Sequence, residues 1–352
     1  MSEHLASLGY RMPAEWEKQS STWVAWPHNK YDWPNKFKNI PKTFAKIISE
    51  ISKVQRVDVL IQPSANKKEI LEILAKEQSQ IRNIFMYKVR TDRAWTRDFA
   101  PNFLVNNNLK KKLIPNFQFN AWAKYNNYKN DNQVKIKISE MKQIEIIDIV
   151  QKNKKIVLEG GAIDVNGIGS ILLTKECLLS KIQQRNPTLN KTNLEKCLYE
   201  TLGVKNFIWL HKGIVGDDTH GHIDDITRFF DINKIFTAVE KNKKDKNYAA
   251  LKENLNILQK AKNIYGKKFE IFEIPMPDPI FIENTRVPAS YLNFYFANKI
   301  LLVPIFENKM DDKAIAVFEK KIKNRKIIPI NCLDLIWGFG AIHCMTQQEP
   351  FI

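Results

Sequence analysis

The 352-residue sequence has few of the features that mark secreted, metal-binding or membrane proteins. It contains four cysteines (Cys177, Cys197, Cys332 and Cys344), too few for a disulfide scaffold, and no CxxC pair or His/Cys cluster has zinc spacing. It does not open with a basic stretch followed by an apolar run, and no apolar stretch approaches the roughly 20 residues that a membrane helix needs. We therefore expect a soluble, cytoplasmic protein without a secretory signal, a membrane span or a bound metal.

Positive charge is the main compositional bias, with 55 Lys and Arg against 38 Asp and Glu and a formal net charge of +17 at pH 7. Such a balance suggests nucleic-acid binding. The lysines, however, lie in short runs such as NNNLKKK and EKNKKDKN, without interleaved aromatic residues. Solvated loops and helix faces explain these runs more simply, so we expect no nucleic-acid partner. Any site for a cationic ligand must then be locally acidic.

Strand-like and helix-like segments alternate along the whole chain. Runs such as VQRVDVLIQ, GSILLT and KILLVPIF are rich in β-branched residues and are bounded by Gly, Asn or Pro. Between the strand-like runs lie segments such as NIPKTFAKIISEIS and YAALKENLNILQKAKN, whose apolar residues recur every three or four positions. No linker and no legible repeat interrupts the pattern. The sequence therefore predicts an α/β protein without an obvious domain boundary, and its length leaves one or two domains open.

Four segments rich in catalytic residue types follow strand-like runs: RAWTRDFAPN, VLEGGAIDVNG, GDDTHGHIDDITRFF and GFGAIHCMTQQEP. Loops held by a rigid scaffold are where functional sites usually lie. In the third segment, read as extended, His222 and Asp224 share one face while Ile223 points away. An acid–base role and a solvated acidic loop are both open for this segment.

The other segments have equally plain alternatives. Glu159 ends an apolar run, where a carboxylate is costly to bury unless a partner such as a histidine pairs with it, but EGG is also an ordinary turn. Asp98 follows Arg97, and the two could form a surface ion pair of little value. In the functional interpretation, Asp98 binds a planar cation on which Trp95 stacks.

Together the segments offer a thiol, an imidazole and several carboxylates. A serine-type triad does not need several carboxylates, whereas a nucleophile that attacks a guanidinium does, because carboxylates match the N–H donors of that planar cation. Taken in order, the motifs resemble those of the agmatine deiminases, part of the guanidine-modifying group that includes arginine and peptidylarginine deiminases. The resemblance covers essentially the full length, from MPAEWEKQSSTWVAWPHN through ECLLSKIQQRNP to WGFGAIHCMTQQEP.

The resemblance implies a single catalytic domain over residues 1–352. Its fold would be a five-bladed α/β propeller (pentein fold) with pseudo-five-fold repeats and an active site on the central axis. No cofactor is expected, and the protein would be a homodimer or higher oligomer. The resemblance also implies a role for each matching residue. Cys344 is the nucleophile, His222 the general acid/base and Glu159 the acid that orients this histidine. Asp98 and Asp224 are the carboxylates that grip the guanidinium.

Two further residues carry over to the substrate pocket: Trp95 as one of its aromatic residues, and Asp218 as an acid near the amine end of agmatine. The glycines before Cys344 are expected to let the backbone approach the site closely. His343 adjoins Cys344, and neighbours on an extended chain point to opposite faces, so we expect His343 to be structural.

Five positions depart from the family pattern. Phe339 and Ala341 interrupt a glycine run, Asp225 and His220 replace other residue types, and Ala100 stands where a glycine is common. These changes leave the shape of the pocket, and so the tail of the substrate, open.

The expected reaction is hydrolysis of agmatine to N-carbamoylputrescine and ammonia through a covalent thiouronium on Cys344, in putrescine and polyamine biosynthesis. One alternative is a deiminase acting on peptidyl-arginine or free arginine, although Asp217 and Asp218 favour agmatine. The other alternative, from a different class, is a non-catalytic basic nucleic-acid-binding protein.

Overall fold

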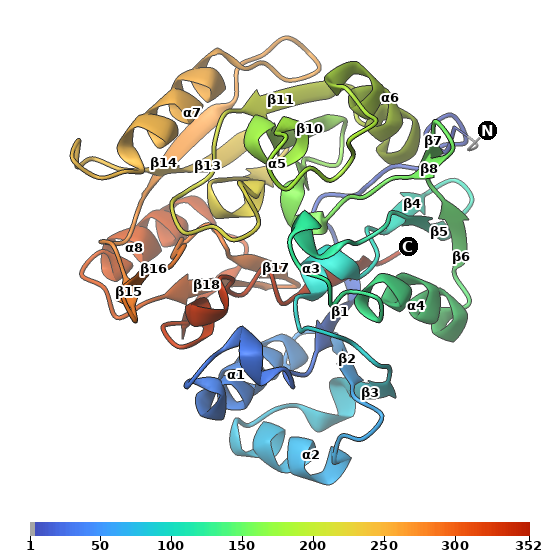
Figure 1. Ribbon diagram of the computed structural model, residues 1–352, viewed down its shortest axis with the longest axis vertical. Coiled ribbons are helices and arrows are strands. Elements are labelled where there is room, and N and C mark those ends of the chain that lie inside the picture. Colours follow the sequence, from blue (N-terminus) through green and yellow to red (C-terminus); the bar gives the residue numbers. More distant parts are fainter. Residues whose placement is uncertain (1–3) are drawn as a thin grey trace.

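Five small sheets of one design surround a common centre (Figure 1). The computed structural model describes residues 4–352. In each sheet a first strand lies antiparallel to a second, and a helix then leads from the second strand to a third that lies parallel to it. This architecture confirms the predicted α/β propeller and its five-fold repeat.

Four of the sheets follow one another along the chain. Their strands are β4 (Leu104–Asn106), β5 (Lys111–Asn116) and β6 (Glu145–Asp148); β9 (Asp164–Val165), β10 (Ser170–Thr174) and β11 (Asn206–Leu210); β12 (Thr227–Asp231), β13 (Lys234–Val239) and β14 (Glu270–Pro275); and β17 (Tyr295–Ala297), β18 (Ile300–Ile305) and β19 (Lys326–Asn331). The connecting helices are α4 (Val134–Lys142), α6 (Lys191–Leu202), α7 (Tyr248–Lys260) and α8 (Asp311–Lys321), and the short α5 (Lys175–Leu179) precedes α6. Two hairpins complete these parts: β7 (Val150–Gln151) with β8 (Lys154–Lys155), and β15 (Phe281–Ile282) with β16 (Thr285–Arg286).

The remaining sheet joins distant parts of the chain. Its elements are β1 (Gln19–Ala25), α1 (Ile40–Ser52), β2 (Arg56–Ile61), α2 (Lys67–Lys76), β3 (Ile84–Lys88) and β20 (Gln347–Pro350). Strand β20 pairs antiparallel with β1, with Thr22 opposite Gln348. This pairing closes the ring and fixes the segment just before β20.

Helices α1 and α7 form where the sequence predicts them, because each buries an apolar stripe against its sheet. Helix α1 carries a proline in its first turn and buries Phe44, Ile48 and Ile51. Helix α6 ends at Gly203, whose φ of 74° is the left-handed conformation typical of a helix C-cap. None of the helices within residues 4–352 is long and apolar enough to span a membrane.

The five repeats direct equivalent turns toward the centre. Each turn lies just before the first strand of a sheet: α3 (Thr96–Phe99) before β4, the 3-10 turns η6 (Gly160–Ala162) before β9 and η7 (Ile223–Asp225) before β12, the turn of residues 290–293 before β17, and the turn of residues 342–345 before β20. Four of these turns carry or adjoin residues that the sequence analysis singled out. The fivefold design therefore explains why those motifs are evenly spread along the chain.

Candidate active site

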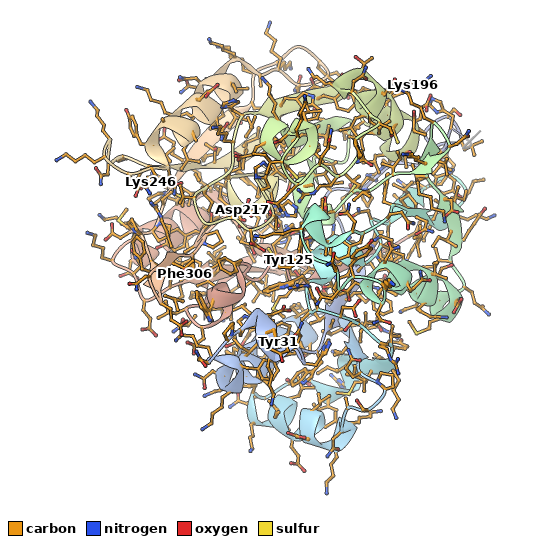
Figure 2. The ribbon with its side chains drawn as sticks, viewed as in Figure 1. Tyr31, Tyr125, Lys196, Asp217, Lys246 and Phe306 are labelled. Carbon is orange, nitrogen blue, oxygen red and sulfur yellow. The ribbon has the colours of Figure 1, made fainter. Side chains whose placement is uncertain are left out.

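A cavity of about 560 Å³ opens at the centre of the ring. Its buried inner end is lined by Trp95, Asp98 and Cys344, and its outer part by Tyr31, Tyr125 and Asp218, among others. Tyr125 lies near the middle of the ring in Figure 2. Tyr31 lies over the part of the chain that carries β1 and α1, and it is 91% exposed. The cavity thus leads from solvent to Asp98 and Cys344. Two other predicted catalytic residues do not line it but lie next to these two: His222 is 3.9 Å from Asp98, and Asp224 is 3.8 Å from Cys344.

Cys344 is buried, and its sulfur lies 3.8 Å from Asp224 Oδ2. The segment before it packs tightly: a Cβ on Gly340 would lie 2.9 Å from the Trp95 ring and 3.0 Å from Cys344 Cβ. The close approach expected of the glycines is therefore confirmed. Burial raises the pKa of Cys344 well above its ordinary value, and the carboxylates of Asp224, Asp225 and Asp98 raise it further.

His222 caps η7 and is buried beside two carboxylates. Its Nδ1 lies 3.9 Å from Asp98 Oδ1 and 3.9 Å from Asp224 Oδ1, and neither ring nitrogen has a hydrogen-bond partner among residues 4–352. Burial alone would lower the pKa of His222, but the neighbouring carboxylates and Cys177 raise it well above its ordinary value. The imidazole therefore favours the protonated form and is free to exchange a proton with a ligand.

Glu159 is buried just before η6 and pairs with Arg185, with Oε1 accepting a hydrogen bond from Nε at 3.0 Å. Burial opposes its charge, yet Arg185 and His222 hold the pKa of Glu159 below its ordinary value. It makes no hydrogen bond to His222, so any orienting effect on the imidazole acts through charge. Sequence reasoning missed Arg185, although KIQQRNP belongs to a motif that carried the resemblance.

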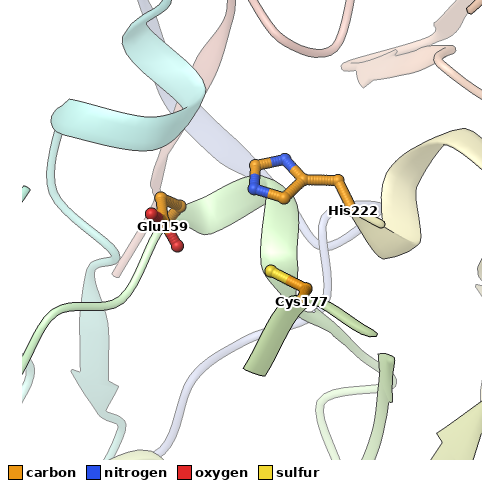
Figure 3. A group of neighbouring side chains, drawn as sticks. All are labelled: Glu159, Cys177 and His222. Carbon is orange, nitrogen blue, oxygen red and sulfur yellow. The ribbon is translucent and has the colours of Figure 1, made fainter. Parts of the chain in front are cut away.

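Cys177 and Glu159 both lie next to the His222 imidazole (Figure 3). Ligand atoms of Glu159, Cys177 and His222 all lie within 4.8 Å of one another, which is a spacing that a metal ion accepts. A structural zinc site takes four ligands, however, and the Arg185 guanidinium already neutralises Glu159. We assign no metal to these residues.

Asp98 lies at the inner end of the cavity and not on the surface. Its Oδ2 accepts a hydrogen bond from Trp122 Nε1 at 2.8 Å, and its Oδ1 accepts one from the Gly161 N–H at 2.9 Å. Arg97 points elsewhere, to Glu15 at 3.1 Å, so the alternative of a surface Arg97–Asp98 pair is wrong. Burial raises the pKa of Asp98, while His222 lowers it in part.

Asp224 faces the thiol and the imidazole from η7. Its Oδ2 lies 2.6 Å from His343 Nδ1, and its Oδ1 has no hydrogen-bond partner among the described residues. Burial would raise the pKa of Asp224, but His343 and His222 bring it below its ordinary value, so the group is an anion. The predicted extended conformation is wrong here, because Ile223–Asp225 form a 3-10 turn that brings His222 and Asp224 together.

His343 belongs to a buried network beneath the site. Its Nε2 lies 2.7 Å from Glu15 Oε2, and Glu15 also pairs with Arg97 and Arg228. The predicted extended chain is wrong at this point too, since residues 342–345 form a turn. The His343 side chain links Asp224 to Glu15 and so holds a carboxylate of the site in place.

The outer part of the cavity carries two acids, each with a cationic neighbour. Asp218 forms an ion pair with Lys124 and accepts a hydrogen bond from the Tyr125 hydroxyl at 2.7 Å. Asp32 pairs with Arg93 at 2.6 Å, and burial raises the pKa of Asp32 to about 6 although Arg93 lowers it. Sequence reasoning missed Asp32, which stands alone in a tyrosine- and tryptophan-rich segment.

Asp217, by contrast, does not line this cavity. Its carboxylate accepts hydrogen bonds from the backbone N–H groups of Thr219, Gly221 and His222, at 2.8, 2.7 and 2.9 Å. The expectation that Asp217 favours a substrate ammonium is therefore wrong. Asp217 shapes the loop that carries His222.

Among the five departures from the family pattern, Phe339 alone is in the cavity lining formed by residues 4–352. It adopts a left-handed φ of 62° and packs against Trp337, with ring centroids 5.9 Å apart. The deeper wall is formed by Trp95, whose ring lies 5.2 Å from that of Trp33. The aromatic character predicted for the pocket thus comes from several segments.

Comparison with known proteins gives a consistent picture. Residues 11–350 match the family model of the Porphyromonas-type peptidyl-arginine deiminases. The structure of an agmatine deiminase of Enterococcus faecalis, described as catalysing its reaction, is 27% identical with a TM-score of 0.89, and the match covers 100% of this chain and 98% of that one. An agmatine deiminase of C. jejuni with a cysteine-to-serine substitution and substrate bound is 30% identical with a TM-score of 0.85, over 97% of this chain and 96% of that one. An amidinotransferase from Microseira wollei, 13% identical with a TM-score of 0.54, shares the fold alone.

Proposed function

Because the chain belongs to the Porphyromonas-type peptidyl-arginine deiminase family, we propose that it is a hydrolase that converts agmatine to N-carbamoylputrescine and ammonia. One observation carries the proposal: Asp224 lies 3.8 Å from the sulfur of Cys344, which lines the cavity, and 3.9 Å from His222. A thiol, an imidazole and carboxylates therefore surround one small volume. The agmatine deiminases among the structural neighbours support the same substrate.

The guanidinium of the substrate binds between Asp98 and Asp224. A carboxylate has lone pairs for several donors, so Asp98 keeps capacity beyond its bonds to Trp122 and Gly161, and Asp224 Oδ1 is wholly free within the described chain. Both carboxylates can accept N–H donors of the planar cation. This local acidity overrides the repulsion expected from a chain with a net charge of +17.

Binding of the cation prepares the nucleophile. The carboxylates that raise the pKa of the thiol in the empty site become neutralised, so Cys344 loses its proton to solvent more easily. The thiolate attacks the central guanidinium carbon and forms a carbon–sulfur bond, while the π electron pair of the carbon–nitrogen bond moves onto nitrogen. Protonated His222 gives its proton to a nitrogen of the adduct, the carbon–nitrogen bond breaks, and ammonia departs from a thiouronium on sulfur.

Hydrolysis reverses these roles. Neutral His222 takes a proton from a water molecule whose oxygen adds to the thiouronium carbon. The carbon–sulfur bond breaks, its electron pair returns to Cys344, and the ureido product leaves after losing a proton to solvent. The negative charge of Glu159 favours the protonated imidazole, which is the form that the first step starts from and the form that the second step produces.

The outer part of the cavity suits a substrate with a terminal ammonium. Asp218 and Asp32 present carboxylates there. Free arginine would need an available cation for its carboxylate, but Lys124 and Arg93 are each engaged by one of these acids. This arrangement favours agmatine over the alternative of peptidyl or free arginine.

The test is ammonia release from purified protein offered agmatine, free arginine or an arginine-containing peptide, with Cys344→Ser as the blank. We expect turnover of agmatine alone. Turnover confined to arginine or the peptide would show that the substrate assignment is wrong. No ammonia release from any of the three would show that the proposed reaction is wrong.

We further propose that residues 1–352 act as a single catalytic domain, in the cytoplasm, as a homodimer or higher oligomer, and in putrescine biosynthesis. Light scattering after size-exclusion chromatography measures the oligomeric state. A gel-shift assay with DNA and RNA at several salt concentrations tests the expectation of no nucleic-acid partner.

A further inference from the structure

The turn before β17 brings a side chain to the thiol that sequence reasoning did not single out. Asn293 is buried, and its amide lies 3.1 Å from the Cys344 sulfur. We propose that Asn293 is a further catalytic residue, which fixes the turn carrying Cys344 and donates a hydrogen bond to its sulfur, and that Asp225 is the positioning residue that orients this amide. The role of the thiol rests on the proposed function, but the contact itself is tested below without turnover.

The carbonyl end of the amide holds the backbone on which the thiol stands. Asn293 Oδ1 accepts hydrogen bonds from the backbone N–H groups of His343 at 3.0 Å and Cys344 at 3.3 Å. The His343 N–H also donates to the Asn293 backbone carbonyl at 3.1 Å. The fourth repeat turn is thereby tied directly to the fifth.

The amino end of the amide faces the reacting atom. Asn293 Nδ2 donates to the Cys344 sulfur at 3.1 Å and to Asp225 Oδ1 at 2.9 Å. The side chain thus makes the two donor and two acceptor contacts open to a primary amide. Rotating the amide by half a turn would set its NH2 group against the backbone N–H groups of His343 and Cys344, so those two contacts fix its orientation.

This donor matters because the acidic side chains around the thiol disfavour its charged form. Asp98 and Asp224 do so, and Asp225 does so once it ionises. A hydrogen bond to the charged form of a group favours that form. The Asn293 N–H therefore offsets part of their effect on sulfur and lowers the pH at which the nucleophile forms.

Asp225 is arranged to remain a neutral acid. It is buried and faces the carboxylates of Asp224 and Asp217, the His222 imidazole and the Asn293 amide. Burial and the two carboxylates raise the pKa of Asp225 well above its ordinary value, against the smaller effects of the imidazole and the amide. As a neutral acid it still accepts from Asn293, and it adds charge beside the thiol only when it ionises at alkaline pH.

The experiment measures thiolate formation at Cys344 directly. The rate of alkylation by iodoacetamide is followed against pH by mass spectrometry of the Cys344 peptide, alongside kcat/KM for agmatine. We expect Asn293→Ala to shift the alkylation profile to higher pH and to lower kcat/KM roughly 10- to 100-fold, as for loss of a hydrogen bond to a charged group. We expect Asp225→Asn to shift the profile the opposite way, because no carboxylate charge can then form beside the thiol at alkaline pH.

A matched control is Asn263→Ala, which removes another buried amide that tethers a loop, through N–H groups of Tyr265 and Lys267. This variant should change stability and leave the alkylation profile unchanged. Circular dichroism confirms that each variant is folded. If Asn293→Ala does not fold, the isosteric Asn293→Asp replaces it and should shift the profile upward even more, since it places a charge against sulfur.

An alkylation profile of folded Asn293→Ala or Asn293→Asp that overlays the wild type would overturn the proposal, whatever the activity. If neither Asn293 variant folds, the test rests on Asp225→Asn. A pH profile of Cys344 alkylation in Asp225→Asn that is unchanged, or shifted to higher pH, would then overturn the proposal. If the alkylation profiles shift as expected but the protein does not turn over agmatine, the proposed function is wrong. The proposed contact between Asn293 and Cys344 is then still supported.

Discussion

Gly161 and His222 pack so closely that a Cβ on the glycine would lie 2.5 Å from the imidazole Nδ1. The same carbon would lie 2.8 Å from Asp98 Oδ1. The second glycine of EGG is therefore required by the approach of an imidazole to a carboxylate. A strand-end turn alone would not need it.

We accordingly expect Gly161→Ala to displace His222, to lower kcat at least about tenfold and to destabilise the protein by about 1–3 kcal/mol. Steady-state kinetics and urea unfolding measure the two effects. The control is Gly266→Ala, where no atom lies within 4 Å of the added carbon but φ is 76°, so stability should fall while activity is kept. If Gly161→Ala and Gly266→Ala have the same kcat, then Gly161 is not needed to position His222.

The catalytic pair gives the largest expected losses. Cys344→Ser and His222→Ala should each lower kcat at least about a thousandfold, because each removes a group that makes or breaks a covalent bond. Single-turnover measurements of ammonia release check this. Near-normal turnover in folded His222→Ala would reject its role as acid and base.

His343→Ala tests the link to Asp224. Removing the imidazole should let the pKa of Asp224 rise, because the hydrogen bond and charge that lower it are lost. The carboxylate would then bind the guanidinium less well, so we expect KM for agmatine to rise about tenfold and most at acidic pH. A change confined to thermal stability, as the sequence analysis expects, would reduce His343 to a structural residue.

The outer acids should set the preference for the substrate tail. Asp218→Asn removes a negative charge and leaves the Lys124 ammonium unpaired beside the ammonium of agmatine, so KM should rise about tenfold with kcat little changed. The matched variant Lys124→Ala removes the competing cation and should lower KM or leave it unchanged. If Lys124→Ala raises KM for agmatine more than Asp218→Asn does, the ammonium end of agmatine does not bind near Asp218.

The buried network around Glu15 makes stability depend on pH. Although burial opposes its charge, Arg228, His343 and Arg97 hold the pKa of Glu15 well below its ordinary value of 4.5. A carboxylate with a lowered folded-state pKa stabilises the protein above its unfolded-state pKa, and this contribution is lost as the pH falls through the folded-state value.

We therefore expect the free energy of unfolding of the wild type to fall below about pH 4.5, and Glu15→Gln to lose about 3–5 kcal/mol at neutral pH because buried arginines are left unpaired. Urea unfolding at several pH values measures both. A variant as stable as the wild type at neutral pH would show that the network contributes nothing.

Sequence reasoning located the site better than it located the repeat. The motifs around Asp98, Glu159, His222 and Cys344 are rich in charged or reactive residues, so they stand out from their apolar neighbours. The five equivalent turns share a backbone position and not a residue type, and for this reason no repeat is legible. Asn293 stayed hidden because it is a neutral amide within the apolar run SYLNFYF.

Local conformation and partners were harder to predict. Helix α4 was not predicted, because its buried face includes the polar residues Lys135 and Ser139 and so lacks a regular apolar spacing. Lys135 is buried because its Nζ donates to the Phe99 carbonyl at 3.0 Å, a partner that only the folded chain supplies. The 3-10 turn at Asp224 and the pairing of Glu159 with Arg185 depend on segments far apart in the chain. Side-chain alternation along an assumed strand could not reveal either.

The pairing of β20 with β1 also sets the order in which the site is assembled during synthesis. The ribosome delivers Asp98, Glu159, His222 and Asn293 before Cys344, and the turn that carries the thiol is held between Asn293 and a strand that must return to the first sheet. A nascent chain can therefore form four sheets before it contains the thiol that we propose as the nucleophile. Under the proposed function, reactivity toward guanidines begins only when β20 pairs with β1 and closes the ring.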